Sequence, residues 1–117
     1  MKAALSLATA LVFALQTPAN ADLYNVNGNQ LLTMCVEKND LTQGVCIGYV
    51  ISIADVYLAS HIPEPMRICM SSEVTRQQLV DVTVAFLRSH PEQRHFIAAG
   101  VVWDALHTAF PCKSNSR

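Results

Sequence analysis

The sequence predicts an all-α domain of four helices, arranged as two helical hairpins and tied by two disulfides. Apolar residues recur at helical spacing in several segments, and no segment alternates polar and apolar residues for long. Four cysteines in so short a chain indicate a disulfide framework, because the N-terminal segment described below indicates export. The cysteines are Cys35, Cys46, Cys69 and Cys112.

The first hairpin is predicted from two segments of different character. The first helix covers Gln30 to Lys38 and ends at Asn39. The second covers Val45 to Ser60, and Asp40 or Thr42 can cap it. Because this run is apolar on nearly all sides, we expect a central, buried helix. Its β-branched residues leave a strand as the competing interpretation, but its length favours a helix.

The third helix has the clearest start signal. Thr75 and Gln78 have the spacing of a capping box, and Val74 and Leu79 flank them as a hydrophobic staple. Apolar residues then follow on one face until the helix ends at Ser89.

The fourth helix follows directly. His90 and Pro91 separate the two helices, and Pro91 can occupy the first turn of the fourth, where its missing N–H costs nothing. Pro111 ends this helix. We expect its core-facing stripe, which would bury Trp103, to be Phe96, Ala99, Trp103, Leu106 and Phe110.

The two-hairpin topology predicts how the cysteines pair. Cys35 and Cys46 lie about one turn on either side of the first hairpin's turn, so they should face each other. The end of the fourth helix returns towards the start of the third, which brings Cys112 beside Cys69. The rival pairing of Cys46 with Cys69 spans the second helix, more than about 20 Å at 1.5 Å per residue, and ranks second.

The N-terminus has the order of a secretory signal peptide. Lys2 is followed by an apolar run from Ala3 to Leu15, and Ala19-Asn20-Ala21 has small residues where signal peptidase cleaves. A transmembrane anchor is the alternative, but it needs about 20 apolar residues. We therefore expect residues 1–21 to be removed and residues 22–117 to form a single exported domain.

Charge and histidine spacing argue against several classes of function. The formal net charge is −1 and no basic patch stands out, which argues against nucleic acid and membrane partners. No C-x-x-C pair is present, and no histidine lies four residues from another, so we predict no metal, cofactor or catalytic site. The histidines are His61, His90, His95 and His107.

Asp55 is the unusual charge, because it lies in the middle of the apolar second helix. One interpretation is a binding or catalytic acid. We favour the alternative, that Asp55 faces a groove or bonds Ser52, an arginine or a tyrosine inside the fold, because a lone acid lacks a second acid or base.

The segment from His61 to Ser72 is the candidate partner-binding loop. It is stiffened by Pro63 and Pro65, and a stiff loop loses little entropy on binding. The alternative is that it only connects the two hairpins. The residues predicted to contact a partner are His61, Glu64, Met66, Arg67, Met70, Ser71 and Ser72.

The motifs taken in order resemble the Rap/Tai-type immunity proteins. The likeness covers residues 28 to 112. It rests on Cys35, Cys46-Ile47-Gly48-Tyr49, Asp55, Val74-Thr75-Arg76-Gln77-Gln78-Leu79, His90-Pro91 and Phe110-Pro111-Cys112. Ser52 stands where this family often has glycine. The residues we assign to structural motifs are Gly48, Tyr49, Asp55, Thr75, Gln78, His90, Pro91 and Trp103.

The resemblance implies a function as well as a fold. Proteins of this family are periplasmic, helical and disulfide-bonded, need no cofactor, and often act as dimers. The studied members bind peptidoglycan amidase effectors of type VI secretion and occlude their active sites. The resemblance therefore implies a periplasmic immunity protein whose partner is a secreted amidase. A small periplasmic stress protein or chaperone of the acid-response type is the alternative. A hydrolase or metal enzyme is a further class, which the absence of paired catalytic groups in the sequence disfavours.

Overall fold

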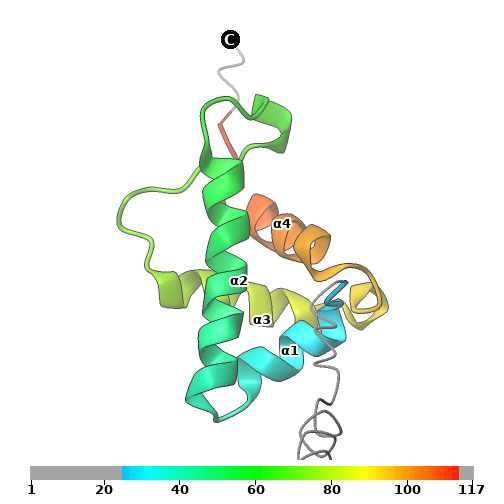
Figure 1. Ribbon diagram of the computed structural model, residues 1–117. Coiled ribbons are helices and arrows are strands. Elements are labelled where there is room, and N and C mark those ends of the chain that lie inside the picture. Colours follow the sequence, from blue (N-terminus) through cyan, green and yellow to red (C-terminus); the bar gives the residue numbers. More distant parts are fainter. Residues whose placement is uncertain (1–24, 114–117) are drawn as a thin grey trace, which may run out of the picture.

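Four α-helices and two short 3-10 helices make up residues 25–113, the part of the chain that the computed structural model describes (Figure 1). An isolated bridge between Asn27 and Ile97 is the only extended pairing in these residues, so the all-α prediction is confirmed. The predicted signal peptide, residues 1–21, lies outside them. The elements in chain order are α1 (Gly28–Val36), α2 (Asp40–Leu58), η2 (Glu64–Met66), α3 (Arg76–Ser89), η3 (Pro91–Gln93) and α4 (Ala98–Ala109).

Asparagine side chains begin both helices of the first hairpin. Asn27 and Gln30 form a capping box, so α1 begins two residues before the predicted start. Asn39 accepts hydrogen bonds from the backbone N–H groups of Leu41 and Thr42, at 2.9 and 3.3 Å. The prediction that Asp40 or Thr42 caps α2 is wrong, because the extended residue Asn39 already satisfies these donors.

Both predicted disulfides are present. Cys35–Cys46 joins α1 to α2 across the first hairpin, and Cys69–Cys112 joins the connection after α2 to the end of α4. No free cysteine remains among the described residues. The pairing deduced from the two-hairpin topology is confirmed, and the rival pairing of Cys46 with Cys69 is wrong.

The second hairpin has a longer turn than the sequence suggested. The capping box of Thr75 and Gln78 is confirmed, and His90 ends α3 by donating its N–H to the Phe86 carbonyl. Pro91 begins η3 rather than α4, so its predicted place in the fourth helix is wrong. The cause is long-range: Ile97 pairs with Asn27 in the isolated bridge and Ala98 donates its N–H to the Val26 carbonyl at 2.7 Å, so α4 begins only at Ala98.

The register of α4 also differs from the predicted stripe. Phe96 precedes the helix and is 55% exposed, and Ala99, Trp103 and Phe110 are only half-buried. Leu106 is buried as predicted. The face that packs into the core consists of Ala98, Val101, Val102, Ala105 and Leu106.

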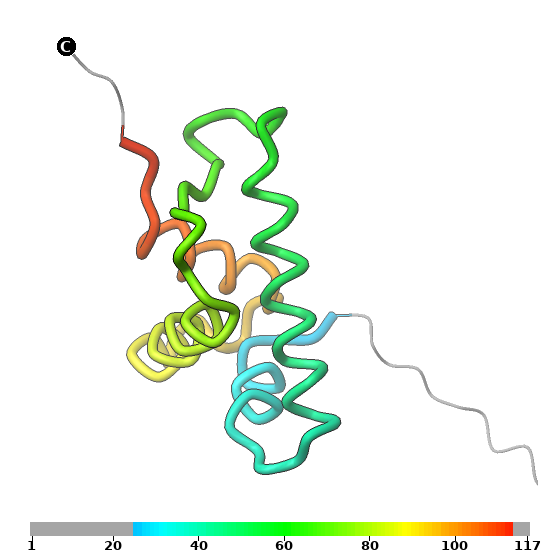
Figure 2. Tube along the Cα trace, turned by 90° about the vertical axis from the view of Figure 1, so that its left-hand side faces the viewer, coloured from blue at the N-terminus to red at the C-terminus, as the bar shows by residue number. Residues whose placement is uncertain are grey.

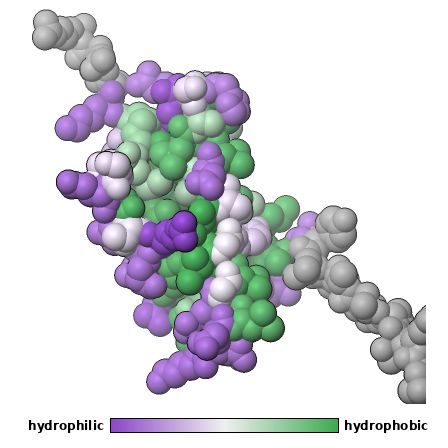
Figure 3. Space-filling model, turned by 60° about the vertical axis from the view of Figure 1, so that its left-hand side comes forward, coloured by the Kyte–Doolittle hydropathy of each residue, from purple (hydrophilic) through white to green (hydrophobic). Residues whose placement is uncertain are grey.

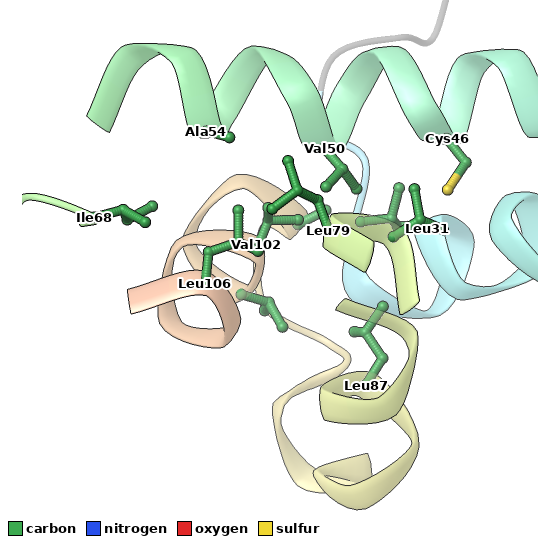
Figure 4. Packing of buried hydrophobic residues seen from close by; sticks show 12 residues of the cluster. Leu31, Cys46, Val50, Ala54, Ile68, Leu79, Leu87, Val102 and Leu106 are labelled. Carbon is green, nitrogen blue, oxygen red and sulfur yellow. The ribbon is translucent and has the colours of Figure 1, made fainter. Parts of the chain in front are cut away.

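The core lies between α2 and the three other α-helices. Figure 4 shows α2 lying across it, with Val50 and Cys46 pointing towards Leu31 and Leu79. Leu87 of α3 is buried in the same cluster of side chains. The nonpolar surface these side chains remove from water is the main stabilising contribution to so small a domain.

Only one face of α2 takes part in this core. Cys46, Val50 and Ala54 are buried, but Leu41 is 77% exposed and Val56 is 53% exposed. The prediction of a helix buried on all sides is wrong, because α3 and α4 lie on the same side of α2 (Figure 2). By length and composition α2 could also cross a membrane, a test that the core helix of a soluble protein passes too.

Gly28 lies where the start of α1 meets the turn of the second hairpin. A Cβ atom there would come within 2.9 Å of the Arg94 Cα and 3.0 Å of a Leu87 methyl carbon. We therefore expect Gly28→Ala to lower the free energy of unfolding by about 1–3 kcal/mol. Denaturant unfolding measures this, with Gly100→Ala as the control, since a Cβ at Gly100 meets nothing within 4 Å. Equal loss in both variants would contradict the packing explanation.

Candidate functional site

The connection between α2 and α3 contains the predicted partner-binding residues and has two parts. The first, residues 59–68, forms a loop around η2 beyond the C-terminal end of α2, and we call it the tip loop. The second, residues 69–75, runs back along the molecule to the start of α3 and includes a turn at Ser72 and Glu73; we call it the extended segment. Figure 1 shows the tip loop above α2 and the extended segment beside it.

Arg67 holds the tip loop together from within. Its Nε and Nη2 atoms donate to the Ile62 carbonyl at 3.1 and 2.9 Å, and Nη2 also approaches the Ser60 carbonyl at 3.4 Å. Charged donors make hydrogen bonds of about twice the usual strength. The guanidinium therefore shapes the loop, and its predicted partner contacts remain a prediction.

Four contacts attach the connection to the body of the domain. The N–H of Ile68 donates to the Tyr57 carbonyl and that of Cys69 to the Phe110 carbonyl, both at 3.0 Å. The Trp103 indole Nε1 donates to the Met66 carbonyl at 2.8 Å. The disulfide of Cys69 with Cys112 completes the attachment. Although the connection contains no long helix, these bonds fix it to α2 and to the region of α4.

The outer surface of the tip loop presents mixed chemistry. His61, Glu64 and Met66 are exposed, as a binding role requires. Below them lies a hollow of about 380 Å³, whose lining includes Glu64 and His107. The His107 ring stacks on Trp103 with centroids 4.7 Å apart, so this hollow lies beside the indole that supports the loop.

A second hollow, a groove of about 450 Å³, lies between α2 and the extended segment. The exposed Asp55 lines it, which agrees with the groove-facing form of the favoured interpretation, whereas Ser52 bonds to the Tyr49 carbonyl and not to Asp55. Figure 3 brings this side of the molecule forward and shows apolar surface interrupted by polar groups. The complete lining is Ile51, Ala54, Asp55, Leu58, Met70, Ser71, Ser72, Val74, Arg76 and Leu79.

The predicted partner-binding residues therefore divide between two places. Four belong to the tip loop, and Met70, Ser71 and Ser72 line the groove. The sequence interpretation missed the groove residues Ile51, Leu58 and Arg76. The helical spacing of Ile51, Asp55 and Leu58 was the available signal, because positions i, i+4 and i+7 share one side of a helix.

Gly48 and Tyr49, adjacent in the sequence, have different surroundings. Gly48 is exposed, and a Cβ there would meet nothing within 4 Å. Burial raises the pKa of the Tyr49 phenol above its ordinary value of 10.0, although a hydrogen bond with the backbone of Ala99 acts in the opposite direction. Tyr49 is therefore a neutral group between α2 and α4.

The described residues contain no group of three or more His, Cys, Asp or Glu side chains that could hold a metal ion. Asp55 stands in the groove with Arg76 and two serines, without a second acid or a histidine in the lining. This arrangement suits recognition of another molecule better than acid–base chemistry.

Comparison with known families agrees with this chemistry. Residues 27–112 match the family model of the Rap1a immunity proteins. The chain belongs to the Rap1a immunity protein family. No curated protein matches the chain. Membership makes this an immunity protein with a protein effector as its partner, and together with the two disulfides it indicates an exported protein.

Proposed function

We propose that this Rap1a family member is a periplasmic immunity protein that binds a peptidoglycan amidase delivered by type VI secretion and occludes its active site. Support comes from the family match, from the two disulfides, and from the cleavage signal at Ala19-Asn20-Ala21. Cleavage after Ala21 leaves the domain in an oxidising compartment, where both disulfides persist.

The tip loop is the part of the surface that we assign to the amidase cleft. The observation that carries this assignment is its pre-organisation: Arg67 bonds the loop internally and Trp103 bonds it to α4. A loop already held in one conformation loses little entropy on binding, so its contacts contribute more of their energy to affinity. Glu64 and Met66 are exposed on it for polar and apolar contacts.

Alanine substitutions in the tip loop test the assignment. Glu64→Ala and Met66→Ala each remove an exposed side chain without disturbing the hydrogen bond from Trp103, which ends on the Met66 backbone carbonyl. We expect each to weaken amidase binding about tenfold or more, the effect of a residue near the centre of an interface. Calorimetry with purified candidate amidases, together with inhibition of peptidoglycan hydrolysis, measures the loss.

Glu92→Ala is the matched control, because Glu92 is an exposed glutamate in η3, which belongs to the turn between α3 and α4. It should bind as tightly as the wild type. If Glu92→Ala loses binding and the tip-loop variants keep it, the interface lies elsewhere. If the wild type binds no peptidoglycan amidase and inhibits none, the proposed function itself is wrong.

The outer face of α2 supports a homodimer as part of the same function. Leu41, Val45 and Val56 are exposed there, and a Cβ at Gly44 or Gly48 would meet nothing within 4 Å. Each glycine costs a helix about 1 kcal/mol relative to alanine, and no contact within the described chain requires it. In an antiparallel pair of α2 helices, Val56 of one copy would lie over Gly44 of the other and bury this apolar face.

Gly48→Lys tests the dimer, because a lysine at the centre of this face would separate the two helices. We expect light scattering to show a dimer for the wild type and a monomer for the variant. Gly100→Lys should remain dimeric, since Gly100 is equally open but lies on α4. A monomeric wild type, or a dimer that survives Gly48→Lys, would exclude this interface. Binding of the wild type to lipid vesicles would instead assign the face to a membrane.

A further inference from the structure

The groove between α2 and the extended segment has the features of a peptide-binding site. We propose that it receives an extended segment of the partner protein, in which an apolar side chain is flanked by a basic residue facing Asp55 and an acidic residue facing Arg76. The identity of that partner rests on the proposed function; the recognition chemistry rests on the groove itself.

The walls of the groove are apolar and its volume suits side chains. Ile51 and Leu58 contribute from α2, and Met70 and Val74 from the opposite wall. The small side chain of Ala54 lies between Ile51 and Leu58 on α2, which leaves room above the buried Leu79. A hollow of about 450 Å³ falls within the usual range of roughly 300–1,000 Å³ for ligand sites.

Two side chains of opposite charge line the groove. Asp55 belongs to α2 and Arg76 to the first turn of α3, and both are exposed. In the described part of the chain no hydrogen bond joins them, and both exposed side chains line the groove, so both charges are accessible to a ligand. Exposed charges of this kind add modest affinity but determine the orientation in which a partner docks. They therefore select a segment with one cation and one anion in a defined order.

The backbone of Met70 is available for pairing. Among the described residues, its N–H and C=O make no intramolecular hydrogen bond, whereas the N–H of Cys69 is engaged and the carbonyl of Ser71 accepts from Val74, which closes a turn at Ser72 and Glu73. A peptide that lies beside Met70 in an extended conformation can bond to these free backbone groups. The wall is fixed at one end by Cys69–Cys112 and at the other by the capping box of Thr75.

The groove and the proposed dimer face adjoin on α2. Ile51, Asp55 and Leu58 recur at helical spacing on the side towards the extended segment. Gly44 and Gly48 of the dimer face lie seven residues before Ile51 and Asp55, and therefore border the groove. The opposite charges of Asp55 and Arg76 favour a charged segment of a different protein as the occupant of the groove, because the dimer face of a second copy is apolar.

Selection from a random heptapeptide phage library tests the proposal without any assumption about the amidase. The target is the immobilised mature protein with both disulfides formed. We expect enriched sequences to share an apolar residue between a basic and an acidic one. A synthetic peptide with the enriched sequence should bind Asp55→Arg and Arg76→Glu at least about tenfold more weakly than the wild type, which is 1.4 kcal/mol or more.

Matched charge changes outside the groove provide the controls. Asp81→Arg and Arg88→Glu alter exposed residues of α3 that do not line it, and they should bind the peptide like the wild type. Selection on the double variant Asp55→Arg with Arg76→Glu should enrich the opposite order of charges. The absence of any enriched sequence, or equal binding by the groove variants, would overturn the proposal.

The outcomes separate this proposal from the proposed function. Peptide selection that succeeds while no amidase binds would support the groove and reject the amidase as partner. Amidase binding that persists while the selected peptides ignore Asp55→Arg and Arg76→Glu would reject the groove and leave the proposed function standing.

Discussion

Replacing both Cys69 and Cys112 by alanine is expected to lower the free energy of unfolding by about 4 kcal/mol. The two cysteines are 43 residues apart in the sequence, and closing so long a loop removes much of the conformational entropy of the unfolded chain. Removal of Cys35–Cys46, with a separation of 11 residues, should cost about 3 kcal/mol on the same argument. Denaturant unfolding of both double variants measures the two losses.

The two double variants should also differ in function. Loss of Cys69–Cys112 releases the junction between the tip loop and the extended segment, so partner binding should weaken beyond what the stability loss explains. Loss of Cys35–Cys46 alters the far hairpin and should leave binding intact at temperatures where the protein is folded. If both variants bind equally well, the tip loop does not depend on its disulfide anchor.

The features that sequence reasoning predicted correctly depend on local rules. The capping box of Thr75 and Gln78 is contained in four residues, and its geometry follows from those residues alone. The disulfide pairing needed only the hairpin topology, because short connections place the ends of neighbouring helices together. Such inferences require no knowledge of which helix faces contact each other.

The incorrect predictions depend on contacts between distant residues. The start of α4 is determined by the bond from Ala98 to Val26, and no pattern within residues 91–98 contains that information. The hydrophobicity of α2 could not reveal that its neighbours lie on one side, because a helix that packs within the chain and one that packs on another protein have similar compositions. Exposure of Leu41 and Val56 is therefore a finding of the structure alone.

In the candidate site, too, local features were predictable from the sequence and contacts between distant residues were not. The sequence marked residues 61–72 as one loop, but the backbone bonds of Ile68 to Tyr57 and of Cys69 to Phe110 divide it into a tip loop and a groove wall. Asp55 was recognised as unusual from its apolar neighbours, whereas its position beside Arg76 required the folded arrangement of α2 and α3.

Trp103→Ala is expected to lower the free energy of unfolding by about 3 kcal/mol, at the lower end of the range for a large aromatic residue. The side chain is half-buried rather than central, but it packs on the core. Its ring lies 6.0 Å from Tyr57 and 4.7 Å from His107, so its removal leaves two aromatic neighbours without a partner. Thermal and denaturant unfolding measure the loss.

Trp103→Phe separates packing from hydrogen bonding. Phenylalanine retains most of the aromatic contact but cannot donate to the Met66 carbonyl, so we expect a loss of about 1 kcal/mol from the missing bond. Because that bond attaches the tip loop to α4, Trp103→Phe should also weaken amidase binding while the protein remains folded. If Trp103→Phe binds like the wild type and Trp103→Ala unfolds at the wild-type temperature, the indole neither stabilises the domain nor positions the loop. The pre-organisation that carries the proposed function would then have to come from Arg67 and the disulfide alone.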